Sequence, residues 1–177
     1  DAVQRLLLAG DRRHAAYQIR RRNIFLGHFM RYGGWYHWHL CLFRRSGHRY
    51  HGLVHERLNI EGPIGYLNAD LQHEPFQSIE QFISRQNRYT TLQAKELFET
   101  RGRLPWAIVR RTLWGRPVNR FWKFYVKKQG FREGMHGFLF SSLFAWVEFL
   151  IWVKYWQLVE TATADCGRSQ VSVMAVP

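Results

Sequence analysis

The first half of the chain has short stretches in which apolar and polar residues alternate or apolar residues run together. Both patterns are typical of β-strands. We predict strands over 15–20, 38–43, 50–56 and 64–71, and we expect 38–43 to be buried because it is the most apolar of them. Glycine and proline lie between several of these stretches and mark turns.

After residue 77 the apolar residues recur at helical spacing instead. Ser78 is a suitable N-cap residue, and Glu80 lies in the first turn of the helix that should follow. Gly102 and Pro105 predict the end of that helix.

Two basic, aromatic segments come next, and each predicts a helix. They cover 106–114 and 118–128, and Gly115-Arg116-Pro117 predicts a break between them. The following segment, 137–153, is almost wholly apolar. The tail from Thr161 is polar and small, and we expect it to be loose.

These elements predict an α/β chain in which a few strands are followed by several helices. We expect three parts, namely an α/β part over 1–76, a helical, membrane-associating part over 77–160 and a loose tail over 161–177. A chain of 177 residues is long enough to bury a real core.

Charge and aromatic content narrow the classes of partner. The chain has 26 Lys and Arg against 13 Asp and Glu, a formal net charge of +13, so its surface will attract anions. Nucleic acid, an acidic membrane surface and phosphorylated substrates are the candidates. Hydrophobic residues make up 46% of the chain and aromatic residues 16%, which excludes a disordered chain. The two cysteines, Cys41 and Cys166, predict neither a disulfide framework nor a zinc ribbon.

The apolar segment 137–153 allows three interpretations. A spanning helix needs roughly 20 apolar residues, and this segment is shorter and contains Glu148. Its many aromatic residues, and the basic residues before it, favour a helix that lies in the membrane interface beside anionic headgroups. A buried core helix and a true transmembrane span are the alternatives.

A series of short motifs runs through the chain in a characteristic order and spacing. They are Gly33-Gly34-Trp35-Tyr36, Leu42-Phe43-Arg44-Arg45, Val54-His55-Glu56, Gly62 with Gly65-Tyr66-Leu67, His73, Asn87-Arg88-Tyr89-Thr90 with Ala94, Pro117, Phe121 with Tyr125, and Gly130-Phe131-Arg132-Glu133-Gly134 with Gly137-Phe138. With these motifs the chain, from Tyr17 to about Leu158, resembles the C-terminal half of a bacterial family 2 glycosyltransferase of the lipopolysaccharide core or surface glycan type.

The resemblance implies a GT-A fold, a Rossmann-like α/β sandwich, of which this chain would be the C-terminal part. It implies an inverting transfer of a sugar from a nucleotide-diphosphate donor to a lipid-linked or lipopolysaccharide acceptor. Glu56 would be the general base, and His73 would be a ligand of Mn²⁺ or Mg²⁺. The residues expected to bind substrate are Gly33, Gly34, Trp35, His55 and Arg88.

The residues themselves leave alternatives open for these roles. Inverting transfer needs a carboxylate that takes the proton of the acceptor hydroxyl, and Glu56 follows an apolar run that suits this task. The alternative is a surface acid paired with Arg49 or Arg57. His73 is alternatively a structural histidine, because Mn²⁺ and Mg²⁺ also need carboxylates. Arg88 is alternatively one charge of a solvated helix face.

The resemblance also implies partners and a location. The expected partners are a nucleotide-sugar donor, a glycan or glycolipid acceptor and a membrane surface with anionic lipid, and no nucleic acid. The expected location is cytoplasmic, peripheral at the inner face of the cytoplasmic membrane. The donor-binding half of the family, with its Asp-x-Asp metal motif, has no counterpart in the sequence, so we expect this chain to be inactive by itself.

Other interpretations stay open. Charge and aromatic content allow a basic nucleic-acid-binding module, although no recognised motif supports one. A remnant without function is a further possibility. His51 and His55 have the spacing of a helical zinc pair, but a strand would hold them too far apart to bind one ion.

Overall fold

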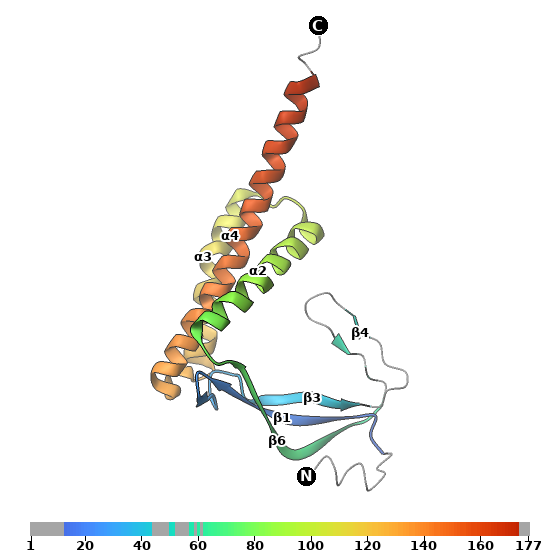
Figure 1. The fold of residues 1–177 in the computed structure, drawn as a ribbon, viewed down its shortest axis with the longest axis vertical. Coiled ribbons are helices and arrows are strands. Elements are labelled where there is room, and N and C mark those ends of the chain that lie inside the picture. The colour runs from blue at the N-terminus through green and yellow to red at the C-terminus, as the bar shows by residue number, and fades with distance from the viewer. Residues whose placement is uncertain (1–12, 44–49, 52–56, 59, 61, 174–177) are drawn as a thin grey trace. The chain divides into compact units, whose positions relative to one another are not determined.

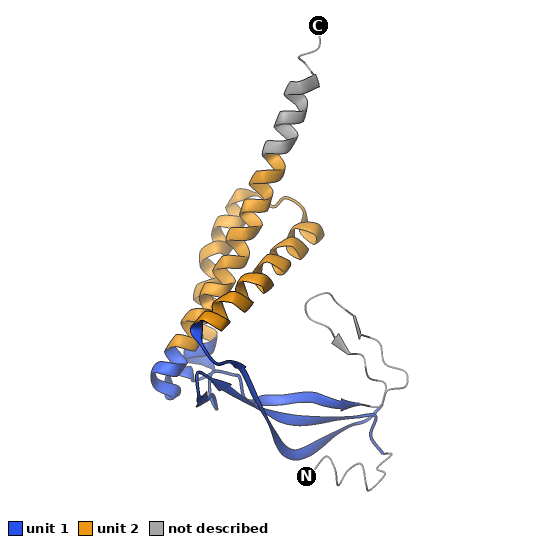
Figure 2. Cartoon of the chain, viewed as in Figure 1, with its two compact units in different colours: residues 1–79, 124–138 blue, residues 80–123, 139–177 orange. Residues whose placement is uncertain are grey.

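The computed structural model describes residues 13–43, 50–51, 57–58, 60 and 62–173. Its fold is mixed α/β, as the sequence predicted. Within the described residues, a four-stranded sheet is followed by three helices (Figure 1). The chain divides into two compact units (Figure 2), which are 1–79 with 124–138 (unit 1) and 80–123 with 139–177 (unit 2).

Strand β1 (Ala16–Phe25) is the central strand of the sheet in unit 1. The short β2 (His28–Phe29) and β3 (His37–Phe43) pair with it in antiparallel orientation. The long β6 (Ile64–Phe76) pairs with it in parallel orientation. The predicted strands 15–20 and 64–71 are therefore confirmed, and both are longer than the apolar pattern indicated.

A second, two-stranded antiparallel pair consists of β4 (Tyr50–His51) and β5 (Arg57–Leu58). The strand predicted over 50–56 begins with β4, and residues 52–56 lie outside the described part of the chain.

One face of β1 forms the core of unit 1. Tyr17, Ile19, Asn23 and Phe25 alternate along the strand and are all buried. Met30 and Phe76 are buried as well. Asn23 therefore occupies an apolar position of the pattern, where its amide needs hydrogen-bond partners.

Residues 38–43 form a strand as predicted, but the prediction that this strand is buried is wrong. The segment is strand β3, but it contains no buried residue, and Trp38 and Phe43 remain 41% and 38% exposed. The reason is that β3 is an edge strand, since β1 is its one partner within the described residues.

Helix α2 (Ile79–Arg101) confirms the first predicted helix. Gly102 ends it, because its backbone takes up a left-handed φ of 59° and its N–H donates to the carbonyl of Phe98.

Helix α3 (Trp106–Trp122) is continuous, so the break predicted at Gly115-Arg116-Pro117 is wrong. Proline removes one backbone hydrogen bond. Tertiary contacts hold the helix on either side of it, because Val109 is buried before the proline and Arg120 is bonded to Glu148 after it. Packing of this kind outweighs local propensity in most helices.

Helix α4 (Gly134–Val173) follows a π-helical turn, Lys123–Lys127, and a 3₁₀ turn, Gly130–Glu133. The apolar segment 137–153 lies within this helix. The helix continues to Val173, where the polar residues from Thr161 had predicted a loose tail.

The core of unit 2 joins all three helices. Ala94 of α2, Val109 of α3, and Trp152 and Tyr155 of α4 form one buried cluster. The hydroxyl of Tyr155 donates to the carbonyl of Gly102 at 2.7 Å and accepts the N–H of Leu104 at 2.9 Å. One buried phenol therefore fixes the connection between α2 and α3.

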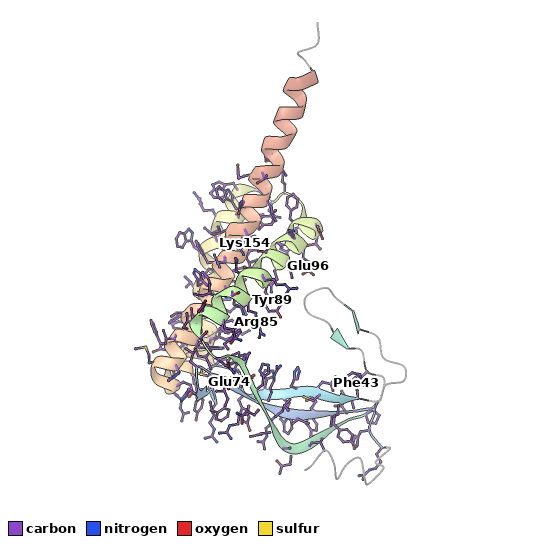
Figure 3. All side chains as sticks on the ribbon, in the orientation of Figure 1. Phe43, Glu74, Arg85, Tyr89, Glu96 and Lys154 are labelled. Atoms are coloured by element: carbon purple, nitrogen blue, oxygen red, sulfur yellow. The ribbon has the colours of Figure 1, made fainter. Side chains whose placement is uncertain are left out.

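We expect Tyr155→Phe to lower the free energy of unfolding by about 1–3 kcal/mol, because the substitution leaves a donor and an acceptor of the α2–α3 connection without their partner. Urea denaturation measures the change. Tyr89→Phe is the control, since Tyr89 is 42% exposed on α2 and should change stability little (Figure 3). Equal stability of the two variants would contradict this role of Tyr155.

Candidate functional site

The segment Gly33-Gly34-Trp35 lies in the loop between β2 and β3. Gly33 and Gly34 have φ values of 77° and 78°, a left-handed conformation that residues with a side chain adopt at a cost. The N–H of Gly33 donates to the carbonyl of Lys128 at 2.8 Å. A Cβ on Gly34 would come within 3.1 Å of the Lys128 side chain. Both glycines are thus required by the conformation of this loop and by its close approach to Lys128.

Asn23 connects this loop to His73. Its side-chain NH₂ donates to the carbonyl of Trp35, and its Oδ1 lies 2.8 Å from Nδ1 of His73. Asn23 and His73 are also direct neighbours in the parallel pairing of β1 with β6. The structure therefore brings together three of the predicted site residues, Gly33, Gly34 and Trp35, with a fourth, His73.

The same contacts assign the proton on His73. The Trp35 carbonyl can only accept, so the amide NH₂ of Asn23 faces it and the amide oxygen faces the imidazole. Nδ1 of His73 must then donate, and in the neutral ring the lone pair stays on Nε2. A donor at Nδ1 with a carbonyl partner is the arrangement typical of histidines that bind metals through Nε2.

Trp35 is held by aromatic packing as well. Its ring stacks with Phe76 at a centroid distance of 6.3 Å and meets Phe25 edge-on at 6.1 Å. Both phenylalanines are buried, so the indole is anchored on the core of unit 1.

Glu133 supports the loop from another segment of unit 1. Its side chain is only 7% exposed, and its carboxylate accepts the N–H of Tyr32 at 2.6 Å and lies 2.7 Å from Nε2 of His28. The ring of His28 stacks on that of His136 at 4.5 Å. The start of α4 packs tightly here, since Gly137 has no room for a side chain beside the carbonyl of Gly130. One buried carboxylate therefore fixes the backbone directly before the glycine pair.

Next to Asn23 the same face of β1 becomes polar. Arg21 pairs with His37, and Ile19 with His39, so these histidines share the face that carries Asn23. Partial burial lowers the pKa of His39, and the charges of Arg21 and His37 lower it further. Burial likewise lowers the pKa of Arg21 and raises that of the Cys41 thiol. This part of the sheet favours the neutral form of His39 near a guanidinium.

On the opposite face of β1, Arg20 contacts acidic and aromatic side chains. It donates to Asn68 at 3.1 Å and lies 3.6 Å from the carboxylate of Asp70. It also lies over the rings of Tyr36 and Trp38. Burial and the hydrogen bond to Asp70 raise the pKa of the Tyr36 phenol. These contacts are exposed and hold β6 against β3 across β1.

The described residues do not by themselves form a metal site. They include no group of three or more His, Cys, Asp or Glu side chains that could hold an ion. His73 would be one imidazole ligand, and the carboxylates that Mn²⁺ or Mg²⁺ prefers are not gathered around it in the part of the chain that the structure describes.

The structure does not test the placement of the other predicted site residues beside this loop. Glu56 and His55 lie in 52–56, outside the described residues. Arg88 lies on α2 in unit 2, where its side chain is exposed.

The neighbours of Arg88 in its motif bind a lysine of α4. Nζ of Lys154 lies 2.7 Å from both the carbonyl and the side-chain oxygen of Asn87, and 2.8 Å from the hydroxyls of Thr90 and Thr91. Within unit 2, this motif therefore joins α2 to α4.

A second polar contact within unit 2 involves two of the basic residues expected to face a membrane. The buried carboxylate of Glu148 lies 2.5 Å from Nη2 of Arg120 and 3.5 Å from Nε of Arg116. These two arginines are paired with a carboxylate of the same unit, although their side chains remain partly exposed, and the other basic residues of α3, Arg110 and Arg111, are exposed as well.

The helical stretch Gly130–Thr163 is long and apolar enough to cross a membrane by length and composition, and its most apolar 18-residue window has a mean hydropathy of 1.5. Only 33% of its most apolar 18-residue window is buried. The interface, core and spanning interpretations of this stretch all remain predictions.

Sequence reasoning missed Asn23 and Glu133. Asn23 gave a signal, because it falls in phase with Tyr17, Ile19 and Phe25 in the alternation of β1. Glu133 stood within one of the motifs but had no assigned role, since its partners His28 and Tyr32 lie more than 100 residues away in the sequence.

No known family model matches the chain, and no solved structure matches it.

We expect Glu133→Ala to increase hydrogen exchange at the backbone N–H of Tyr32 by tenfold or more, because a buried donor loses its carboxylate partner and the loop opens more readily. Exchange monitored by NMR measures this. Glu74→Ala removes an exposed carboxylate of β6 and serves as the control (Figure 3). Unchanged exchange of the Tyr32 amide in Glu133→Ala would show that the carboxylate does not hold the loop.

Proposed function

We propose that this chain is the acceptor-side half of an inverting glycosyltransferase of the GT-A type. The donor would be a nucleotide-diphosphate sugar, and the acceptor a lipid-linked or lipopolysaccharide glycan. The proposal rests on the resemblance of the sequence motifs. The observation that supports it is that Asn23 joins two separate pieces of that resemblance, the Gly33-Gly34-Trp35 loop and His73.

This arrangement suits a substrate-binding loop. Two glycines in left-handed conformation leave backbone without side chains beside a half-buried indole, and sugars are commonly bound against aromatic rings and backbone groups. Two buried polar groups, Asn23 and Glu133, hold the loop from different segments. A loop held in this way loses little entropy when a substrate binds.

In the proposed reaction the acceptor hydroxyl attacks the anomeric carbon of the donor sugar. Its proton goes to the carboxylate of Glu56, which acts as general base. The bond between the anomeric carbon and the diphosphate breaks, and the nucleoside diphosphate leaves with the electron pair. Positive charge must stabilise that leaving group, and Arg88 is the candidate that the resemblance assigns to substrate binding.

The proposal includes Mn²⁺ or Mg²⁺, because the resemblance implies one. Such an ion would neutralise charge on the diphosphate. His73 is its one candidate ligand among the described residues, and its Nδ1 contact with Asn23 suits binding through Nε2. The other ligands would have to come from the donor-binding half that the resemblance requires.

We further propose that the protein lies peripherally on the inner face of the cytoplasmic membrane. The support is the combination of a +13 net charge with an apolar helix that is only partly buried. Basic side chains attract anionic headgroups, and aromatic side chains favour the interface. This location would place the enzyme beside a lipid-linked acceptor.

We expect Glu56→Gln to lower the turnover of the enzyme assembled from this chain and a donor-binding half by about 10²–10⁴-fold, the usual contribution of a general base. Donor affinity should change little, since the amide keeps the shape of the carboxylate. Steady-state kinetics and donor titration measure the two quantities. Glu74→Gln makes the same change of charge on β6 and should stay active. Near-full turnover of Glu56→Gln would remove the proposed role of Glu56.

We expect the chain to sediment with anionic vesicles at low salt, to be released in part by high salt and to be released completely by detergent. Salt screens charges beyond roughly 8 Å at physiological ionic strength, whereas apolar contacts persist. Retention after both high-salt and alkaline washes would instead indicate a spanning helix. A chain that stays in the supernatant at low salt would indicate that α4 is a core helix.

A further inference from the structure

Helices α3 and α4 enclose an apolar groove on the surface of unit 2. Its volume is about 520 Å³, within the range of ligand pockets. The ring centroids of Trp114 on α3 and Phe149 on α4 lie 5.8 Å apart, and both side chains line the groove. The lining residues are Trp114, Pro117, Val118, Phe121, Trp122, Ser142, Ala145, Trp146 and Phe149.

The walls of this groove are unusually exposed for apolar side chains. Trp114 and Val118 are 64% and 67% exposed, and Trp122 is 52% exposed. Contiguous apolar surface of this kind marks a binding site for a protein, a ligand or a membrane. The groove is therefore a candidate binding surface.

Charged residues on the same side of α3 indicate which class of ligand the groove would bind. Arg110 precedes Trp114 by four residues and Arg111 precedes Val118 by seven, so helical spacing places both arginines on the side of α3 that carries the groove. Both side chains are exposed, and within the described residues neither forms an ion pair. An apolar groove that ends at two guanidinium groups complements an apolar chain with an anionic head.

The arginines on the other side of α3 are less suited to binding an anionic group. Arg116 and Arg120 are bonded there to Glu148, in a small polar pocket with Asn119 and Lys123. The carboxylate already neutralises part of their charge. Helix α3 thus has one side that is apolar with two exposed arginines, and one side whose arginines are engaged.

We propose that the groove between α3 and α4 receives an acyl chain of an anionic phospholipid in the bilayer, with Arg110 and Arg111 on its phosphate. This inference rests on the proposed peripheral membrane location and adds the surface through which the chain would bind. A second copy of the chain fits the groove less well, because two chains with a net charge of +13 repel each other. Nucleic acid would leave the apolar walls uncovered.

The first test compares two variants of the whole chain in sedimentation with vesicles of phosphatidylglycerol and phosphatidylcholine in equal amounts. Val118→Asp puts a charge into the groove at an exposed position. Asn119→Asp makes the same change of net charge at the next residue, which lines the polar pocket instead. We expect Val118→Asp to lower the vesicle partition coefficient at least tenfold, and Asn119→Asp to lower it only a few-fold, by the loss of about one unit of attractive charge.

A second test uses substitutions that leave the net charge unchanged and should not disturb the fold. Phospholipids brominated on the acyl chain quench nearby tryptophans, and bromine does not reach residues away from the bilayer. Trp114→Phe should remove a measurable part of the quenching of the whole chain, while Trp122 and Trp146, which also line the groove, keep the rest. Trp38→Phe, which replaces an exposed indole of the sheet in unit 1, should remove little.

The outcomes separate this inference from the location on which it rests. If the unchanged chain binds the vesicles, but the two aspartate variants bind equally well and Trp114→Phe keeps the quenching, the groove is not the binding surface and the peripheral location stands. If the unchanged chain does not bind at all, both are overturned. If Val118→Asp abolishes self-association in sedimentation velocity and leaves vesicle binding intact, a second copy occupies the groove and the inference is wrong.

Discussion

A buried amide is the constraint on which the candidate site depends. Asn23 occupies a core position of β1 and is only 2% exposed, where an unpaired amide would cost several kcal/mol. It is satisfied only when the Trp35 carbonyl and the His73 imidazole are both in place. The loop, the central strand and the parallel strand β6 are therefore specified together, and a register shift of either partner would leave the amide unsatisfied.

Sequence patterns predicted the elements whose signals are local. The alternation of β1 and the apolar run of β6 lie within the elements that they predict, and the capping and stop signals of α2 lie close to its two ends. The continuity of α3 could not be predicted in this way, because it depends on Val109 in the core and on the contact of Arg120 with Glu148, which lies on another helix. The exposure of β3 was missed for a similar reason, since an apolar run does not reveal whether a strand lies at the edge of a sheet.

The candidate site shows the same difference between residues with a local sequence signal and residues that depend on contacts with other elements. The motifs drew attention to the glycine loop and to His73, and the structure brings them together. The residue that joins them, Asn23, was hidden because asparagine in a strand is ordinarily a surface residue or a turn residue. The net charge misled in another respect. Arg116, Arg120 and Lys154 contribute to the +13, yet each binds oxygen atoms within unit 2, so formal charge overstates what this surface offers to a partner.

The contact of Glu133 with Tyr32 has a consequence for the order in which the protein is made. These residues are 101 positions apart, and the loop that carries Gly33-Gly34 is complete only when both exist. During synthesis the N-terminal strands can pair early, because β1, β2 and β3 are close in sequence. The loop must wait until the ribosome has released the chain beyond residue 133. A nascent or prematurely ended chain would therefore carry a sheet with an unsupported loop, and the loop would gain its support only once the segment that carries Glu133 has been translated.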